Sequence, residues 1–195
     1  MEFMLSAIEA ILDNIRDAEE YLVEEDIENF IEIITTADNI FGTGAGRSGL
    51  AAKAFAMRLM HLGLSSYVVG ETISPAINAG DCILAISGSG ETNTIVTAAR
   101  ISKKRGAKVL ALTSYPESSF QLADGIIHVK GRTKVEVDDE NYLKRQIKGN
   151  YTSLTPLGTA FELTSLVFLD GLVSELMEAM GKTEEDLKNR HTVLE

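Results

Sequence analysis

From residue 38 onward, short apolar segments alternate with longer segments of helical periodicity, and this alternation constrains the fold most strongly. The apolar segments are NIFGTG, SSYVVG, CILAIS, KVLALTS and GIIHVK, with helices expected at about 48–62 and 92–105. CILAIS and KVLALT are apolar on both faces, which is typical of parallel strands covered by helices on both sides. The pattern predicts an α/β fold with a doubly wound, five-stranded parallel sheet in the flavodoxin-like order 2-1-3-4-5.

Helices are also expected before and after the sheet. A second helix is expected at about 26–36, and a last long helix begins with Thr155 as N-cap and Pro156 at its first position. The first helix carries an apolar stripe at helical spacing: Met4, Ile8, Ile11, Ile15, Ala18 and Leu22. Because that spacing is close to a heptad, the stripe packs either on the rest of the chain or on the same helix of another subunit.

The 195 residues contain no repeat and no linker, which predicts a single domain over 1–195. Its parts are N-terminal helices at 1–36, a sheet core at 38–130 and a C-terminal helix with a tail at 155–195. The hydrophobic share of 45% excludes a disordered chain. Cys82 is the single cysteine, which excludes a zinc site of several cysteines and fits a reducing compartment.

The formal net charge of −11 argues against a nucleic-acid surface, because phosphate contacts need clustered Lys and Arg. No apolar run approaches the roughly 18 residues of a membrane span, and the N-terminus lacks the basic region of a signal peptide. We therefore expect a cytoplasmic protein without nucleic-acid or membrane partners. An anionic ligand would need a local site.

The loop after the first expected strand, GTGAGRSGL, contains the pattern G-x-G-x-x-G at 44–49. Glycines let the backbone approach an anion, and the following helix N-terminus supplies N–H groups and partial positive charge. A dinucleotide site would also use a carboxylate after the second strand, where Glu71 stands, so a nicotinamide-dependent oxidoreductase is one alternative. A plain turn capped by Ser48 is another.

The loop after the third strand, SGSGET, presents the hydroxyls of Ser87, Ser89 and Thr92 with the amides of Gly88 and Gly90. In the predicted strand order this loop faces the first one at the switch point of the sheet. Such a pair of loops can surround one phosphate with neutral donors. A dinucleotide site does not need the second of these loops. The alternative is an ordinary turn with Thr92 as the N-cap of the next helix.

The segments GTGAGRSGLAAKAFA and AISGSGETNTIVTAARISKKRGAKVLALTS resemble the sugar isomerase (SIS) domain family, whose members bind phosphosugars, and the similarity covers nearly the whole chain. AMRLMHLG, YVVGETISPAI, TPLGTAFE and NRHTVLE are similar to the 6-phospho-3-hexuloisomerase family within it. The resemblance implies interconversion of D-arabino-hex-3-ulose 6-phosphate and D-fructose 6-phosphate, in the ribulose monophosphate pathway of carbohydrate metabolism. It also implies a homotetramer with sites between subunits. The implied substrate-binding residues are Gly46, Arg47, Ser48, Ser87, Gly88, Ser89 and Thr92, of which Ser48, Ser87, Ser89 and Thr92 hold the phosphate.

Other SIS enzymes carry a ring-opening His before the third strand, whereas this chain reads ETISPAINAGD. Moving a carbonyl from C3 to C2 needs proton transfer through a 2,3-enediolate, so we expect no cofactor and no metal. The candidate base is Glu162, in an apolar stretch of the last helix. The alternatives are that Glu162 lies on a solvated side of this helix or that it pairs with an Arg. Arg47 would complement the phosphate, stabilise the enediolate, or form a surface ion pair.

Among the histidines, His191 in the polar tail NRHTVLE is the second catalytic candidate, for proton transfer or carbonyl polarisation, in its own or another subunit. The alternative is a frayed terminus. His61, near a helix end, and His128, in a strand, are expected to be structural, as is Glu91, which would repel a phosphate unless it is turned away.

Three functions thus remain in view: a phosphosugar isomerase, a non-catalytic SIS-type sugar-phosphate sensor, and a nicotinamide-dependent oxidoreductase. Glu162 and His191 favour an enzyme, and the lack of an attached DNA-binding segment disfavours a sensor.

Overall fold

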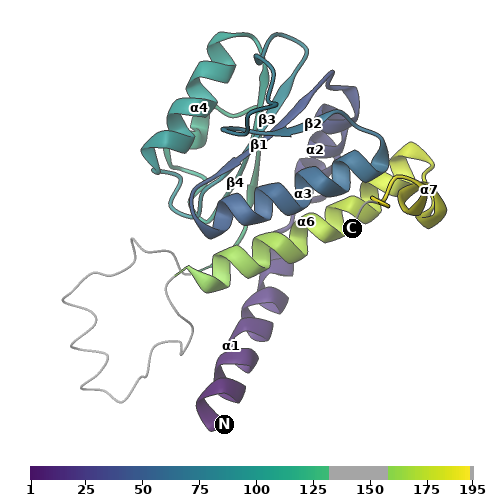
Figure 1. Cartoon of the computed structure of the whole chain (residues 1–195). Coiled ribbons are helices and arrows are strands. Elements are labelled where there is room, and N and C mark those ends of the chain that lie inside the picture. The colour runs from purple at the N-terminus through teal and green to yellow at the C-terminus, as the bar shows by residue number, and fades with distance from the viewer. Residues whose placement is uncertain (132–157, 194–195) are drawn as a thin grey trace.

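The computed structural model describes residues 1–131 and 158–193. Within these residues, five strands form one sheet in the order β2-β1-β3-β4-β5, and each pairing between neighbours is parallel (Figure 1). The strands are β1 (Ile40–Gly44), β2 (Ser66–Val68), β3 (Cys82–Ile86), β4 (Lys108–Thr113) and β5 (Gly125–His128). The predicted α/β fold and strand order are confirmed.

The helices lie close to their expected positions. They are α1 (Glu2–Ala18), α2 (Glu24–Thr36), α3 (Arg47–Leu62), α4 (Asn93–Lys104), α6 (Thr159–Met180) and α7 (Glu184–Asn189), with 3-10 turns η1 (Glu19–Tyr21) and η2 (Ser119–Leu122). The described part of α6 begins after Gly158, and the expected N-cap Thr155 and first residue Pro156 lie outside the described residues. The short helix α7 was not expected, and it begins with a capping box between Thr183 and Asp186.

Two hydrophobic layers cover the sheet, because successive side chains of a strand point to opposite faces. On one face, α2, α3 and α6 pack on Ile40, Leu84, Ile86, Leu110 and Leu112. On the other face, α4 and η2 pack on Phe41, Ile83, Ala85, Val109 and Ala111. This arrangement explains why the central strands are apolar at consecutive positions, and it leaves the carboxyl ends of β1 and β3 free to carry polar loops.

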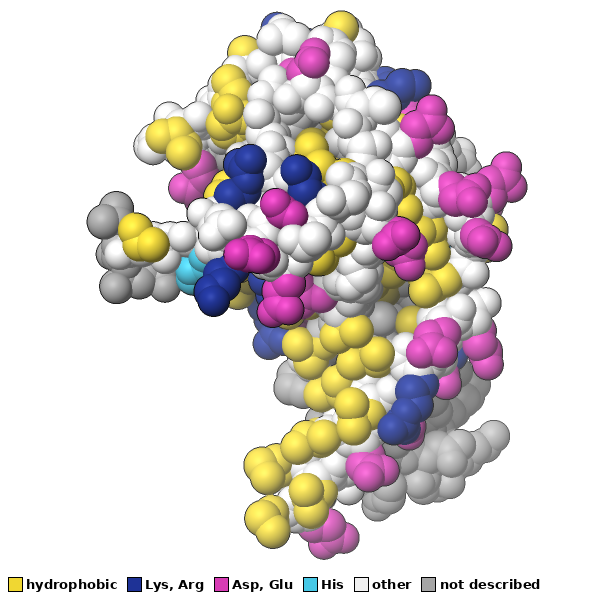
Figure 2. Space-filling model, turned by 90° about the vertical axis from the view of Figure 1, so that its right-hand side faces the viewer, with side chains coloured by type: hydrophobic (Ala, Val, Ile, Leu, Met, Phe, Trp, Pro, Cys, Tyr) yellow, Lys and Arg dark blue, Asp and Glu magenta, His cyan; other side chains and the backbone are white. Residues whose placement is uncertain are grey.

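Helix α1 projects from the rest of the molecule (Figure 1) and is tied to α6 near its C-terminal end. Asn14 Nδ2 donates hydrogen bonds to Thr164 Oγ1 at 2.9 Å and to the Lys130 carbonyl at 3.1 Å. Of the predicted stripe, Ile11, Ile15 and Ala18 are at least partly buried, whereas Met4, Ile8 and Leu22 are exposed. Hydrophobic side chains therefore run along the free part of α1 (Figure 2).

None of the helices in the described part of the chain is long and apolar enough to cross a membrane.

Candidate active site

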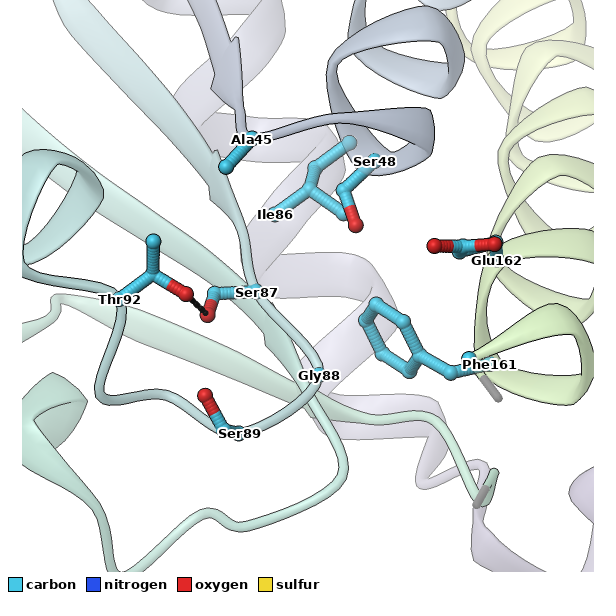
Figure 3. A pocket seen from close by; sticks show the side chains of 10 residues that line it. Ala45, Ser48, Ile86, Ser87, Gly88, Ser89, Thr92, Phe161 and Glu162 are labelled. Atoms are coloured by element: carbon cyan, nitrogen blue, oxygen red, sulfur yellow. Dashed lines mark hydrogen bonds between the residues drawn. The ribbon is translucent and has the colours of Figure 1, made fainter. Parts of the chain in front are cut away.

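The two predicted loops meet at the carboxyl end of the sheet. Gly44, the last residue of β1, is in register with Ile86, the last residue of β3, so the loops that follow start side by side. A cavity of about 210 Å³ lies between these loops and the start of α6 (Figure 3). Its lining residues are Ala45, Ser48, Ile86, Ser87, Gly88, Ser89, Thr92, Gly158, Phe161 and Glu162. This volume suits a small ligand, since drug-sized ligands occupy sites of roughly 300–1,000 Å³.

Glycines allow the first loop to bring the start of α3 against the end of β1. A Cβ at Gly44 would lie 2.6 Å from the Ser48 carbonyl, and a Cβ at Gly49 would lie 2.7 Å from the Gly44 oxygen. Gly46, with a φ of 60°, is the N-cap of α3, and no side chain caps this helix. The hydroxyl of Ser48 therefore lines the cavity instead of closing the turn (Figure 3).

The second loop gathers its three hydroxyl groups at the same cavity. Ser87 Oγ lies 3.0 Å from Thr92 Oγ1, and Ser89 Oγ is directed toward this pair (Figure 3). Thr92 is the N-cap residue of α4, as the alternative interpretation expected, but its side chain makes no capping bond to the helix. The free N-terminus of α4 and the three hydroxyls thus form a neutral donor set suited to an anion.

Hydrogen bonds from the neighbouring strand hold the second loop in place. The Gly88 carbonyl accepts from Ser114 N at 3.0 Å and from Thr113 Oγ1 at 3.3 Å. The Glu91 carboxylate accepts from Ser119 Oγ at 2.8 Å and from Ser119 N at 2.9 Å, which turns it away from the cavity. These two hydrogen bonds keep the pKa of Glu91 below its usual value. Glu91 therefore stays ionised in a structural position.

Glu162 lies opposite the two loops, in the first turn of α6 as described from Thr159. Its carboxylate points across the cavity toward Ser48 (Figure 3), and its side chain is only 13% exposed. The apolar Phe161 and Ile86 side chains line the same space. This is a position from which a carboxylate can reach a bound ligand.

Glu162 also pairs with an Arg, which was the alternative to its role as base. Arg47 Nε lies 2.5 Å from Glu162 Oε2. Among the described residues, no donor meets Oε2 with the geometry of a hydrogen bond, so the contact is an ion pair in character. Of the predicted substrate-binding residues, Gly46 and Arg47 flank the cavity, whereas Ser48, Ser87, Gly88, Ser89 and Thr92 line it.

His191 does not lie at the cavity of its own chain. Its ring stacks on His61, with 5.2 Å between the ring centroids, at the opposite end of α3 from Ser48. His61 is 3% exposed, and burial lowers its pKa, helped by the nearby charges of His191 and Arg58. A role for His191 in the site of another subunit stays a prediction.

His128 and Glu71 also lie outside the cavity lining. The His128 ring packs edge-on against Tyr21, with centroids 4.7 Å apart, and burial lowers its pKa. Glu71 pairs with Lys53 at 2.5 Å, so the carboxylate that a nicotinamide site would use is engaged on the surface. In the described part of the chain, no three His, Cys, Asp or Glu side chains are grouped to hold a metal ion.

Gly158 also lines the cavity, although it was not predicted to be a site residue. Gly158 has a φ of 84°, and a Cβ there would lie 3.1 Å from Glu162 Oε1. The position of Gly158 directly before an apolar helical segment is the sequence signal that could have indicated it. Its role is to let the chain turn into α6 beside the carboxylate.

The family profile of the SIS domain matches residues 33–138. The chain is 39% identical to the 3-hexulose-6-phosphate isomerase of Bacillus subtilis, over 95% of both chains. It is 36% identical to the 3-hexulose-6-phosphate isomerase of Methanocaldococcus jannaschii, over 85% of this chain and 82% of that protein. A crystal structure from Methanococcus jannaschii, for which the function of 3-hexulose-6-phosphate isomerase was inferred, superposes with a TM-score of 0.79 at 32% identity, covering 96% of this chain and 98% of that one.

Proposed function

This chain belongs to the SIS domain family, and from that premise we propose that it interconverts D-arabino-hex-3-ulose 6-phosphate and D-fructose 6-phosphate. Its relatives are named as isomerases of this phosphosugar type, which makes the chain a phosphosugar isomerase. The observation that carries the specific proposal is the single cavity in which three loop serines and Thr92 face the Glu162 carboxylate.

The loop end of the cavity is proposed to hold the phosphate. Ser48, Ser87, Ser89 and Thr92 contribute hydroxyl donors there, and the N-termini of α3 and α4 add backbone N–H groups and partial positive charge. In a protein with a net charge of −11, such a local donor set offsets the repulsion of a dianionic ligand. The sugar carbons then extend toward α6.

Glu162 is proposed as the base that moves the proton. It removes the C2 proton of the 3-ketose, which produces a 2,3-enediolate, and a proton returned to C3 completes D-fructose 6-phosphate. The reverse reaction begins at the C3 proton. Glu162 suits this role because its carboxylate lies across the cavity from the loops, among apolar side chains and largely withdrawn from water. The reaction needs neither a cofactor nor a metal.

The 3-ketose reaches the site in open form. A five-membered ring on C3 would need the oxygen at C6, which carries the phosphate. The missing ring-opening His in the segment ETISPAINAGD is therefore compatible with this substrate. D-fructose 6-phosphate, which is cyclic, still has to open before its C3 proton can be removed.

We also propose that the protein works as a homo-oligomer, a tetramer by family resemblance. The exposed apolar side chains of α1, among them Phe3, Met4 and Ile8, support an assembly that covers them (Figure 2). In such an assembly His191, which is exposed and distant from its own cavity, would contribute to the site of another subunit.

Solvent exchange at C3 tests the proposed reaction. The protein is incubated with D-fructose 6-phosphate in deuterated water, and the C3 proton is followed by NMR. The proposal predicts loss of the C3 proton signal without any added cofactor. Binding without exchange would instead indicate a sugar-phosphate sensor, and exchange only with a nicotinamide would indicate an oxidoreductase.

A further inference from the structure

Arg47 is the first residue of α3, but its charged group is directed at α6. Its Nε lies 2.5 Å from Glu162 Oε2, and Arg47 is not among the residues that line the cavity. The next residue, Ser48, does line it. The first two residues of α3 thus point to different groups: Ser48 offers its hydroxyl to the cavity, and Arg47 offers its cation to the Glu162 carboxylate.

The carboxylate needs that cation. Glu162 is 13% exposed, and its Oε2 has no solvent contact and no well-directed donor among the described residues. A carboxylate withdrawn from water is costly unless an opposite charge compensates it. Arg47 supplies this charge from the more open side, where its own side chain is 54% exposed and remains hydrated.

Glu162 is also confined from the other side. Glu162 Oε1 lies so close to the Gly158 backbone that the Cβ of an alanine at position 158 would be only 3.1 Å from it. The Gly158 backbone therefore lies close to Oε1, and the Arg47 guanidinium pairs with Oε2. The carboxylate is left facing the cavity (Figure 3).

We propose that Arg47 is a positioning residue for Glu162 and not a ligand of the substrate phosphate. The inference rests on the proposed function of the cavity. Arg47 compensates the charge of the carboxylate and holds it aimed at the substrate carbon, because a carboxylate withdrawn from water is costly without a partner of opposite charge. The phosphate is left to the neutral hydroxyls and the helix N-termini.

Two variants and a matched control separate these roles. Arg47→Met removes the charge and keeps an unbranched side chain, while Arg47→Lys restores a charge. Lys53→Met is the control, because Lys53 lies on the same helix and is also 54% exposed. Its Nζ lies 2.5 Å from Glu71 Oε1, and neither residue lines the cavity. Each variant is assayed for kcat and KM in the exchange reaction and for inhibition by inorganic phosphate.

The proposal predicts that Arg47→Met lowers kcat about 100-fold, within the range for a proton-transfer group, and changes the phosphate inhibition constant less than about threefold. Arg47→Lys recovers a large part of the kcat. Lys53→Met changes none of these quantities.

A phosphate inhibition constant that rises about tenfold or more in Arg47→Met, with kcat retained, would make Arg47 a phosphate ligand and overturn the proposal. Equal losses in Lys53→Met would overturn it as well. If the unmodified protein shows no exchange, the proposed function fails, and the pairing is read separately from the ¹³C carboxyl signal of Glu162, assigned by Glu162→Gln. A changed chemical shift of that signal in Arg47→Met supports the pairing, and an unchanged chemical shift contradicts it.

Discussion

Ser87 Oγ lies 3.0 Å from Thr92 Oγ1, so the hydroxyl at the N-cap of α4 bonds to the residue that follows β3, and no side chain caps the N–H groups of this helix. A helix usually begins with a side chain that satisfies one of these N–H groups. Here the side chain and the helix terminus both remain available to a ligand, which is the arrangement expected of a phosphate site.

Ser87→Ala should therefore weaken phosphate binding. The variant loses one donor to a charged group, worth about 1.5–3 kcal/mol, so the Kd of D-fructose 6-phosphate should rise roughly 10- to 150-fold. Calorimetric titration measures this. Ser102→Ala is the matched control, because this buried hydroxyl in α4 bonds the Ala98 carbonyl and should leave the Kd unchanged. A Kd unaffected by Ser87→Ala would remove Ser87 from the site.

Glu162→Gln should abolish proton transfer while binding is retained. The amide has the same shape but cannot accept the C3 proton, so exchange in deuterated water should slow by about 10²- to 10⁴-fold. The Kd of D-fructose 6-phosphate should stay within about threefold, since the base does not hold the phosphate. Glu175→Gln, on an exposed position of α6, is the control. Unchanged exchange in Glu162→Gln would eliminate Glu162 as the base.

Two glycines should respond in opposite directions to alanine. Gly90 has a φ of +66°, and a Cβ there would collide with the Ser118 hydroxyl, so Gly90→Ala should lose at least about 1–2 kcal/mol of unfolding free energy and weaken phosphate binding. Gly171 lies within α6 with open space around its Cβ position, so Gly171→Ala should gain about 0.5–1 kcal/mol. Urea unfolding measures both. A tolerated Gly90→Ala would contradict the described loop conformation.

The stability of the protein should fall as the pH drops below the usual pKa of histidine. Burial, then the charges of His191 and Arg58, lower the pKa of His61 from its usual 6.5. The unfolded chain thus binds a proton at a pH where the folded chain does not, and the free energy of unfolding decreases from pH 6.5 down to the folded-state pKa. His61→Gln, which is neutral throughout, should show a smaller decrease in Tm between about pH 7.5 and about pH 5.5. An equal decrease would exclude His61 as a source of this dependence.

The strands and the two loops could be predicted from the sequence because their signals are local. CILAIS and KVLALT are apolar at consecutive positions, and the sheet buries both of their faces. Given the strand order, the position of Ser48 opposite Ser87 followed from topology alone. Helix α7 was missed because EEDLKN is mostly charged and lacks apolar periodicity, although Thr183 and Asp186 hold the spacing of a capping box.

The contacts between distant segments could not be predicted in this way. Nothing in GTGAGRSGL indicates that Arg47 turns to Glu162 on α6, because the partner of a side chain depends on how α3 and α6 pack. The stacking of His191 on His61 likewise depends on the way α7 returns the chain to the end of α3. The sequence therefore indicated the hydroxyls that line the cavity, but not the contact between Arg47 and Glu162.

We propose that two serine-bearing loops hold the phosphate of a sugar whose reacting carbons face Glu162. A crystal structure with bound D-fructose 6-phosphate would test this arrangement. We expect the phosphate oxygens within hydrogen-bond distance of the Ser48, Ser87, Ser89 and Thr92 hydroxyls, with C2 and C3 next to the Glu162 carboxylate. A phosphate bound away from both loops, or a sugar whose C2 and C3 lie out of reach of Glu162, would contradict it.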